Sequence, residues 1–209
     1  MTKEILDAMH WRYATKVYDP SKKVSREDLM TILEAGRLAP SSIGLEGWKF
    51  IVVENPEIRL KLREAAYGQP KVTDATYIVV IARRTDGENL AQELVMRAAK
   101  QQGVSEESLD GLRKMAEGGV NMPQSNLDAY LMAQTYIPLG IMVETAALLK
   151  IDGGPMGGFD PAKVDEILGL ASKNLKSTTM FAIGYRGEDP AATRPKVRRE
   201  FDEVVEFVV

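Results

Sequence analysis

Apolar residues along this chain follow two patterns, one typical of helices and the other of buried strands. Between about Asn126 and Lys150 they recur on nearly every side of a helical turn, which predicts one long helix. Mostly unbroken apolar runs predict three strands, at Lys49–Val53, Tyr77–Ala82 and Thr178–Gly184. The chain is therefore expected to combine helices with a sheet.

Polar residues mark where several shorter helices begin. Ser25 is followed three residues later by Asp28, an arrangement that resembles a capping box. Asn55-Pro56-Glu57 places a capping residue, a first-turn proline and an acid in the favourable order. Asp160-Pro161 has the same capping pattern, so helices are expected to start near residues 25, 55 and 160.

The stretch from residue 86 to about residue 123 differs from its surroundings. It is charged and helical in pattern, with predicted breaks at Gly103 and at Gly118-Gly119, and Asn121-Met122-Pro123 closes it. We interpret this stretch as a helical excursion over the core. The whole chain, residues 1–209, is then expected to form one domain that carries this excursion.

The long helix is too apolar to lie on a surface. A helix that is apolar nearly all round is normally buried, and a domain of this size has little room to bury it alone. We therefore expect this helix to contribute to a dimer interface. Asp128, Gln134 and Glu144 interrupt its apolar run, which favours a buried helix over a membrane span.

The composition narrows the classes of function. The 209 residues are 44% hydrophobic and 27% charged, which suits a globular protein with a substantial core. A net charge of -3 argues against a general nucleic-acid binder. Cysteine is absent and His10 is the single histidine, so disulfides, thiol nucleophiles, metal sites built from Cys or His, and a Ser-His-Asp triad are not expected. No signal-peptide pattern opens the sequence, and we expect a cytoplasmic protein.

A loop between a predicted helix and a predicted strand is the first candidate for ligand binding. Pro40 ends the helix, and Ser41 and Ser42 offer hydroxyls and backbone N–H groups. Gly44 lets a ligand approach the backbone closely. An ordinary polar connection would look the same, so this loop alone does not identify a function.

Two basic segments near opposite ends of the chain are further candidates. If the first is extended, Arg12, Ala14 and Lys16 share one face, where two cations beside a small residue leave room for an anion. Lys196 and Arg198 share a face in the same way. A solvated basic surface is the alternative interpretation.

A glycine-rich stretch, Gly153 to Asp160, follows the long helix. Its four glycines lie around Pro155 and Met156 and would let backbone lie against a flat ligand. The stretch matches neither the G-x-G-x-x-G nor the Walker pattern, so a Rossmann or P-loop site is not supported. A plain turn between two helices explains the glycines equally well.

Taken together, five motifs in order resemble the nitroreductase family, the FMN-dependent NAD(P)H oxidoreductases. They span nearly the whole chain except the excursion at 86–123. The motifs are Arg12-x-x-x-Lys16, Ala39-Pro40-Ser41-Ser42 with Trp48-Lys49-Phe50, Gly68-Gln69, Pro155-Met156-Gly157-Gly158-Phe159-Asp160, and Arg194-Pro195-Lys196-x-Arg198.

The resemblance implies an α+β, three-layer fold in which helices flank a central mixed or antiparallel sheet. It also implies an intertwined homodimer with two FMN sites at its interface. The apolar C-terminal residues, Val204–Val209, would then reach across as a strand to the partner's sheet.

The resemblance further implies which residues bind FMN. Arg12, Lys196 and Arg198 look like the phosphate clamp, because charge-assisted contacts suit a dianionic phosphate. Lys16 and Lys71 look like the cations beside the pyrimidine edge of the flavin. The other implied contacts come from the glycine-rich stretch, the Gly68-Gln69 break, the other subunit's loop and the first basic segment: Pro155, Met156, Gly157, Gly158, Gln69, Pro40, Ser41, Ser42, Gly44, Tyr13 and Ala14.

The sequence departs from the family pattern at three places. Tyr13-Ala14 stands where a polar or basic residue followed by Ser is common, and Gly44 stands where Asn is common. Gly157 stands where some members carry Glu. We therefore expect fewer hydrogen bonds to the flavin and more room beside its ring.

The activity that the resemblance implies is a ping-pong hydride transfer from NADH or NADPH, through FMN, to a nitroaromatic, a quinone or another flat small molecule. Hydride transfer needs no side-chain acid or base, so no catalytic residue is named. Two alternatives remain open. One is a dimer that binds a flavin or another phosphorylated ligand without turnover, and the other is a family branch with different flavin chemistry, such as dehalogenation or flavin breakdown.

Overall fold

The computed structural model describes residues 2–208. Met1 and Val209, at the ends of the predicted domain and of the predicted C-terminal strand, lie outside the described residues. The helices are α1 (Thr2–Trp11), α2 (Arg26–Arg37), α3 (Pro56–Ala65), α4 (Lys71–Asp74), α5 (Gly87–Gln102), α6 (Asp110–Val120), α7 (Gln124–Leu148) and α8 (Pro161–Leu168). The strands are β1 (Trp48–Val53), β2 (Tyr77–Arg84), β3 (Asp152–Met156) and β4 (Leu175–Gly184).

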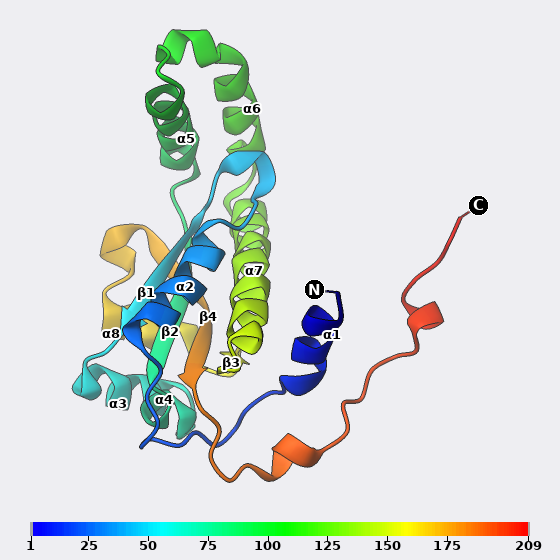
Figure 1. Ribbon diagram of the computed structural model, residues 1–209. Helices are drawn as coiled ribbons and strands as arrows, with labels where there is room; N and C mark the ends of the chain where they lie inside the picture. Colours follow the sequence, from blue (N-terminus) through cyan, green and yellow to red (C-terminus); the bar gives the residue numbers. More distant parts are fainter. Residues whose placement is uncertain (1, 209) are drawn as a thin grey trace.

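The four strands form one antiparallel sheet in the order β1-β2-β4-β3. Successive side chains of β2 point to opposite faces, as the pleat requires. Ile78 and Val80 pack under α3 and α8, whereas Val79 and Ile81 pack under α2 and α7. The result is the expected α+β fold with a three-layer, helix–sheet–helix arrangement (Figure 1).

The glycine-rich stretch forms a strand where a plain turn was one expectation. Its first part is β3, which pairs along the outer side of β4. A Cβ at Gly153 would lie 2.6 Å from the Phe181 ring, and one at Gly154 would lie 2.7 Å from the Tyr18 hydroxyl. The interpretation as a turn between two helices is therefore wrong, because these glycines allow close packing within the sheet.

The long helix α7 has two apolar faces. Leu131, Leu139 and Met142 face the protein interior, where α7 packs against α1, α2, β2 and β3. Tyr136 and Ile137 are exposed on the opposite side. By length and composition alone α7 would also pass as a membrane span, as many core helices do. In the single chain, only one of its faces is buried.

The excursion is a pair of helices, α5 and α6, that extends beyond the sheet (Figure 1). The predicted break at Gly103 is confirmed, since Gly103 ends α5, and it does so in the left-handed conformation. The predicted break at Gly118-Gly119 is wrong, because α6 continues to Val120. A Cβ at Gly119 would collide with Ile43, so this helical glycine lets the Pro40 loop approach closely, and tertiary packing outweighs its low helix propensity.

The chain after β4 leaves the sheet and runs apart from it to the C-terminus (Figure 1). It contains two short 3-10 turns, Pro190–Thr193 and Phe201–Glu203. None of the described residues after Gly184 belongs to a strand, and the Phe207 side chain is 76% exposed. The expected C-terminal strand therefore finds no partner edge within the described part of this chain.

Candidate functional site

The stretch directly after α1 has no regular secondary structure, yet its side chains alternate. Tyr13 and Thr15 are buried, whereas Ala14 and Lys16 are exposed. Alternation with a period of two is typical of an extended backbone. This alternation agrees with the prediction that Arg12, Ala14 and Lys16 share one face of an extended segment.

The same stretch lies beside the chain that follows β4. Tyr18 forms an isolated antiparallel bridge with Arg186. The Asp19 backbone N–H donates to the Tyr185 carbonyl at 2.9 Å, and that of Gly187 donates to the Val17 carbonyl at 3.0 Å. The two basic segments lie near opposite ends of the sequence. They therefore both extend from the place where residues 17–19 pair with residues 185–187, which we call the junction.

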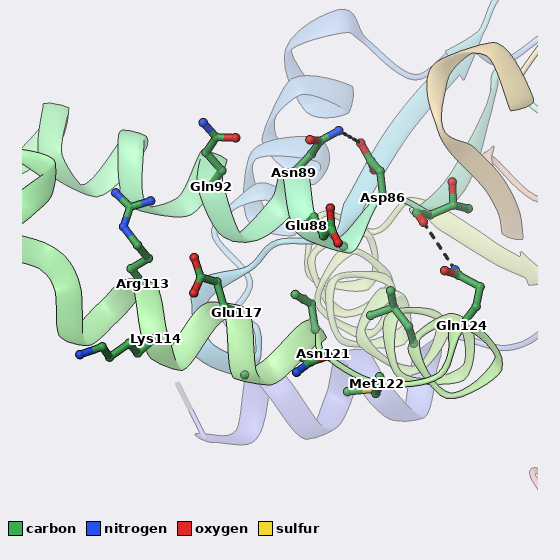
Figure 2. Close-up of a pocket in the computed structure, with 15 residues that line it drawn as sticks. Asp86, Glu88, Asn89, Gln92, Arg113, Lys114, Glu117, Asn121, Met122 and Gln124 are labelled. Atoms are coloured by element: carbon green, nitrogen blue, oxygen red, sulfur yellow. Dashed lines mark hydrogen bonds between the residues drawn. The ribbon is translucent and has the colours of Figure 1, made fainter.

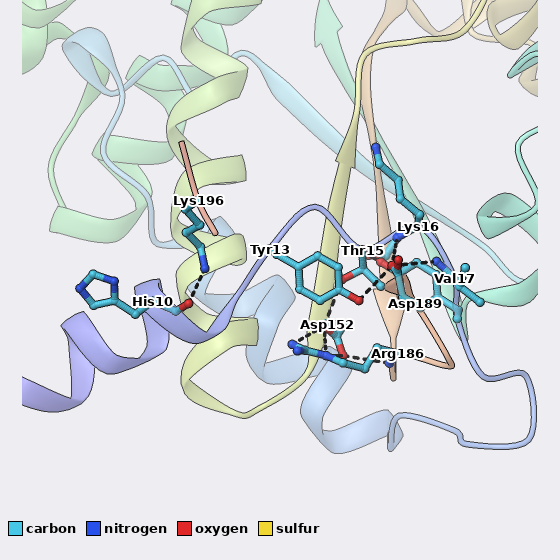
Figure 3. A network of polar contacts seen from close by, with 11 residues as sticks. His10, Tyr13, Thr15, Lys16, Val17, Asp152, Arg186, Asp189 and Lys196 are labelled. Carbon is cyan, nitrogen blue, oxygen red and sulfur yellow. Dashed lines mark hydrogen bonds and ion pairs between the residues drawn. The ribbon is translucent and has the colours of Figure 1, made fainter. Parts of the chain in front are cut away.

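Asp189 is one of two buried carboxylates that hold this junction (Figure 3). Its Oδ2 accepts hydrogen bonds from the Tyr13 hydroxyl at 2.9 Å and from the backbone N–H groups of Lys16 at 2.7 Å and Val17 at 3.2 Å. Burial acts to raise the pKa of Asp189, but these hydrogen bonds outweigh it and lower the pKa. Burial, followed by the bond to Asp189, raises the pKa of Tyr13 to about 12.

Asp152 is the second of these carboxylates. It accepts a hydrogen bond from the Thr15 hydroxyl at 3.0 Å and forms an ion pair with Arg186, Nη2 to Oδ1, at 2.7 Å. The Arg186 guanidinium also lies 4.2 Å from the Trp11 ring centre and 4.6 Å from that of Tyr13. Stacking and ion pairing together fix Arg186 beside the first basic segment.

The three residues of the predicted phosphate clamp gather at this junction. Burial, and then the positive charge of Arg198, lower the pKa of Arg12. Burial, and then the charges of Arg12 and Arg198, lower the pKa of Lys196, whose Nζ donates to the His10 carbonyl at the end of α1. No carboxylate in the described part of the chain forms an ion pair with any of these three cations.

A phosphate fits this cluster. The Arg12 Nε is buried and has no hydrogen-bond partner among residues 2–208. Buried polar atoms in native proteins are normally satisfied, and an orphaned guanidinium nitrogen among other cations lacks an anionic acceptor.

Lys16 and Lys71 form a second group of cations. Lys71, the first residue of α4, is only 5% exposed and has no ion pair within the described chain. Burial, and then the charge of Lys16, lower its pKa from 10.5 to about 8. The Gln69 side-chain amide nitrogen donates to the Gly158 carbonyl at 2.7 Å, which joins this group to the glycine-rich stretch.

The glycine-rich stretch presents mainly backbone at this point. Pro155, Gly157 and Gly158 are exposed, whereas the Met156 side chain is buried in the core. A Cβ at Gly157 would meet no described atom within 4 Å, so the space beside it is open. Any contact from Met156 to a ligand here would have to use its backbone.

The predicted loop residues Pro40, Ser41, Ser42 and Gly44 lie elsewhere. The Ser42 backbone N–H donates to Gln134 Oε1 of α7 at 2.7 Å. In the described chain, no hydrogen bond or ion pair joins the loop to the other predicted cofactor residues. Figure 1 places the loop beside α6, near the start of α7, whereas the chain after α1 runs past the end of α7. The structure thus separates this part of the predicted site from the rest.

A hollow of about 900 Å³ between α5, α6 and the start of α7 is a different feature (Figure 2). Glu88 and Asn89 line it from α5, and Arg113 and Glu117 line it from α6. Among the described residues that line it, none is a predicted cofactor contact.

Asp152, Asp189 and Arg186 hold the junction but carry no recognisable signal in the sequence. Asp189 acts on residues more than 170 positions away, such as Lys16 at a separation of 173. A lone acid after a strand gives no indication of such a partner, so only the path of the chain identifies it.

Comparisons with known proteins agree with this architecture. The model of the Nitroreductase family matches residues 9–185. A Staphylococcus aureus (strain bovine RF122 / ET3-1) protein, assigned by name to the NAD(P)H nitroreductases, is 38% identical over 222 aligned positions, which cover 100% of this chain and 97% of the relative.

Two solved structures show the same fold. A Bacillus subtilis protein described as a nitroreductase has a TM-score of 0.87 at 21% identity, with 100% of both chains covered. An Exiguobacterium sibiricum protein described as a nitroreductase, in complex with FMN, has a TM-score of 0.81 at 21% identity, with 99% of this chain and 96% of the other covered. With the family match over most of its length and its three-layer α+β fold, the chain belongs to the nitroreductase family.

Proposed function

We propose that this protein is an FMN-dependent oxidoreductase that transfers a hydride from NADH or NADPH to nitroaromatics, quinones or similar flat acceptors in a ping-pong cycle. The observation that carries the proposal is the cluster of Arg12, Lys196 and Arg198, which has no carboxylate partner in the described chain. A dianionic phosphate would relieve the repulsion within this cluster and give the buried Arg12 Nε an acceptor. Family membership and the FMN complex of the Exiguobacterium protein favour FMN as the source of that phosphate.

The chain would contribute binding, orientation and charge. FMN, when bound, supplies a ring that accepts and then donates two electrons. Lys16 and Lys71 would place positive charge beside the pyrimidine edge of the ring, which favours electron uptake. Gln69 and the exposed backbone at Gly157 and Gly158 would hold the ring in position, and close stacking of each substrate would exclude water. No side chain is required as an acid or base.

We also infer an intertwined homodimer with FMN at its interface. Met132, Tyr136 and Ile137 form an exposed apolar stripe on α7, and an uncovered stripe of this kind is typical of a protein interface. Gln134, whose side chain accepts a hydrogen bond from the Ser42 backbone N–H, precedes Ile137 by three residues, so these two side chains are neighbours on α7. The Pro40 loop thus borders the stripe, where it would reach the other subunit's flavin.

The exposed C-terminal segment fits the same assembly. Phe207 and Val208 are 76% and 92% exposed, and a dimer would let them cover the partner's surface. We further propose that the chain forms a single cytoplasmic domain, with α5 and α6 as its helical excursion at about 86–123.

The first test is a visible absorption spectrum of the purified protein, recorded before and after anaerobic addition of NADH and then NADPH. A yellow protein that bleaches supports the proposal and identifies the electron donor. A bound flavin that neither nucleotide reduces would instead favour a flavin-binding protein without turnover. A colourless protein that takes up no added FMN would contradict the whole assignment.

The clamp has its own test, with a matched control next to it in the sequence. Arg198→Ala should weaken FMN binding by roughly tenfold or more, because hydrogen bonds to charged groups contribute about 1.5–3 kcal/mol. Arg199→Ala removes the same charge from the adjacent exposed position and should leave binding within about threefold of the wild type. Equal FMN affinity in both variants would show that Arg198 is not part of the clamp.

A further inference from the structure

We infer that Asp189 is a positioning residue that holds the two basic segments of the FMN phosphate site in register, an inference that rests on the proposed function. The Asp189 carboxylate touches the N-terminal segment and the turn that precedes the C-terminal segment. Oδ2 accepts from Tyr13, Lys16 and Val17 on the N-terminal segment. Oδ1 accepts from the Ala191 backbone N–H at 2.9 Å.

The Ala191 contact matters because of where it lies in the chain. Asp189 caps the 3-10 turn Pro190–Thr193, and this turn leads directly into the arm that carries Lys196 and Arg198. The Oδ2 contacts lie within five residues of Arg12 along the other segment. The Asp189 carboxylate therefore sets the position of Arg12 relative to the other two cations.

Repulsion within the clamp makes such a link necessary. After burial, the charge of Arg198 lowers the pKa of Arg12, and the charges of Arg12 and Arg198 lower the pKa of Lys196, so the three cations lie close together. Like charges at this distance push the two segments apart. A site that must exist before phosphate arrives needs contacts that oppose this repulsion. Asp189 supplies three of them, from Tyr13, Lys16 and Val17, while its bond to Ala191 fixes the turn on its own segment. Asp152 supplies the neighbouring link through Thr15 and Arg186.

Asp189 itself is unsuited to touch a ligand. It is only 8% exposed, and it already accepts four hydrogen bonds within the chain, three at Oδ2 and one at Oδ1. Its negative charge would also repel a phosphate. It acts through Arg12, Lys196 and Arg198, which makes it a positioning residue and not a binding residue.

The test compares FMN with riboflavin, which has the same ring and no phosphate. Dissociation constants are measured from the quenching of flavin fluorescence for the wild type, Asp189→Ala and Tyr13→Phe. Asp189→Ala should weaken FMN binding by roughly tenfold or more and riboflavin binding by much less. Tyr13→Phe removes one of the four donors and should have a smaller effect, of about two- to fivefold.

Asp165→Ala is the matched control, because that carboxylate also accepts a backbone hydrogen bond, from Ser177 at 2.8 Å, but joins α8 to β4. It should leave the preference for FMN over riboflavin unchanged. A double-mutant cycle adds Arg198→Ala to Asp189→Ala, and the combined loss should be clearly smaller than the product of the two single losses.

Three results would overturn the inference while leaving the proposed function intact: unchanged FMN affinity in Asp189→Ala, equal weakening of FMN and riboflavin, or a cycle in which the two losses multiply. If Asp189→Ala fails to fold, two milder variants replace it: Asp189→Asn, which keeps one carbonyl oxygen, and Tyr13→Phe, which keeps the carboxylate. The ratio of FMN affinity to riboflavin affinity in these variants then tests the inference. A wild-type protein that binds no FMN would instead overturn the proposed function, and this inference with it.

Discussion

The two basic segments, which meet at the junction around Asp189, and the Pro40 loop were both expected to bind FMN, but the fold places them in different surroundings. At the junction, segments from the two ends of the chain meet, and buried carboxylates join them. The Pro40 loop instead contacts α5, α6 and α7. For example, Arg97 of α5 donates a hydrogen bond to the Gly44 carbonyl at 2.9 Å. One half of the proposed site is therefore assembled within a single chain, whereas in the proposed dimer the other half would come from a second copy.

The Pro40 loop also contains residues in an unfavourable backbone conformation. Ile43 and Glu46, on either side of Gly44, have φ angles of 62° and 49°. Residues other than glycine seldom adopt this left-handed region, and each instance costs of order 1–3 kcal/mol. The packing of the loop against α5 and α6 offsets this strain, so the helical excursion determines the shape of a loop that would serve the neighbouring subunit.

A charge introduced on the exposed face of α7 should have the largest effect on dimer formation and FMN binding. Tyr136 is 51% exposed there, and Tyr136→Glu would bury an unpaired carboxylate in the proposed interface at a cost of roughly 3–5 kcal/mol. The dimer should dissociate and FMN should be lost, as measured by light scattering and flavin content. Leu60→Glu, at a 55% exposed position on α3, is the control. A monomer that keeps FMN would show that both halves of the site belong to one chain.

Mixed dimers of two variants test, by complementation, whether each FMN site is shared between two subunits. Arg198→Ala impairs the clamp, and Ser42→Trp fills space at the loop, so each pure dimer should bind FMN poorly. After the two variants are unfolded and refolded together, mixed dimers should form about half of the population, each with one intact site of two. FMN binding should then return to roughly a quarter of the wild-type sites, by titration. Absence of any recovery would contradict a site shared between subunits.

Lys71 should give the protein a measurable pH dependence. Its pKa is lowered from 10.5 to about 8 by burial and then by Lys16, so the unfolded state binds more protons than the folded state between these pH values. The free energy of unfolding of the FMN-free protein should therefore rise from pH 8 to 10.5, by up to about 3 kcal/mol.

Lys71→Met should remove this rise, whereas Lys61→Met, an exposed control on α3, should retain it in urea titrations at each pH. FMN should favour the protonated amine, so its affinity should fall above pH 8 in the wild type and less in Lys71→Met. An identical pH dependence in Lys71→Met and the wild type would contradict the buried, desolvated position of this amine.

The smallest expected effects compare one glycine from each half of the site. Gly44 has a φ of 86°, so Gly44→Ala should destabilise the protein by about 1–2 kcal/mol. Gly157 has open space around it, so Gly157→Ala should change stability by less than about 0.5 kcal/mol. Thermal denaturation without FMN measures both. Equal losses would mean that the loop is no more strained than the glycine-rich stretch.

Much of the fold could be predicted because its signals are local. Ser25 accepts the Asp28 backbone N–H, Asn55 accepts those of Glu57 and Ile58, and Asp160 caps α8, so all three predicted caps are confirmed. β1, β2 and β4 contain the three predicted apolar runs. The misjudged elements, β3 and the last turn of α6, are glycine-rich segments whose structure depends on distant packing against Phe181, Tyr18 and Ile43.

The sequence by itself determined the caps, the strands, the basic segments and the order of motifs that places the chain in its family. These features depend on periodicity and on hydrogen bonds that span a few residues. Only the tertiary structure decided that Arg12 lies near Arg198, that Asp189 links their segments, and that the Pro40 loop lies apart from both. Such contacts depend on the path of the whole chain through space, because residues so distant in sequence meet only when the sheet and its helices have packed.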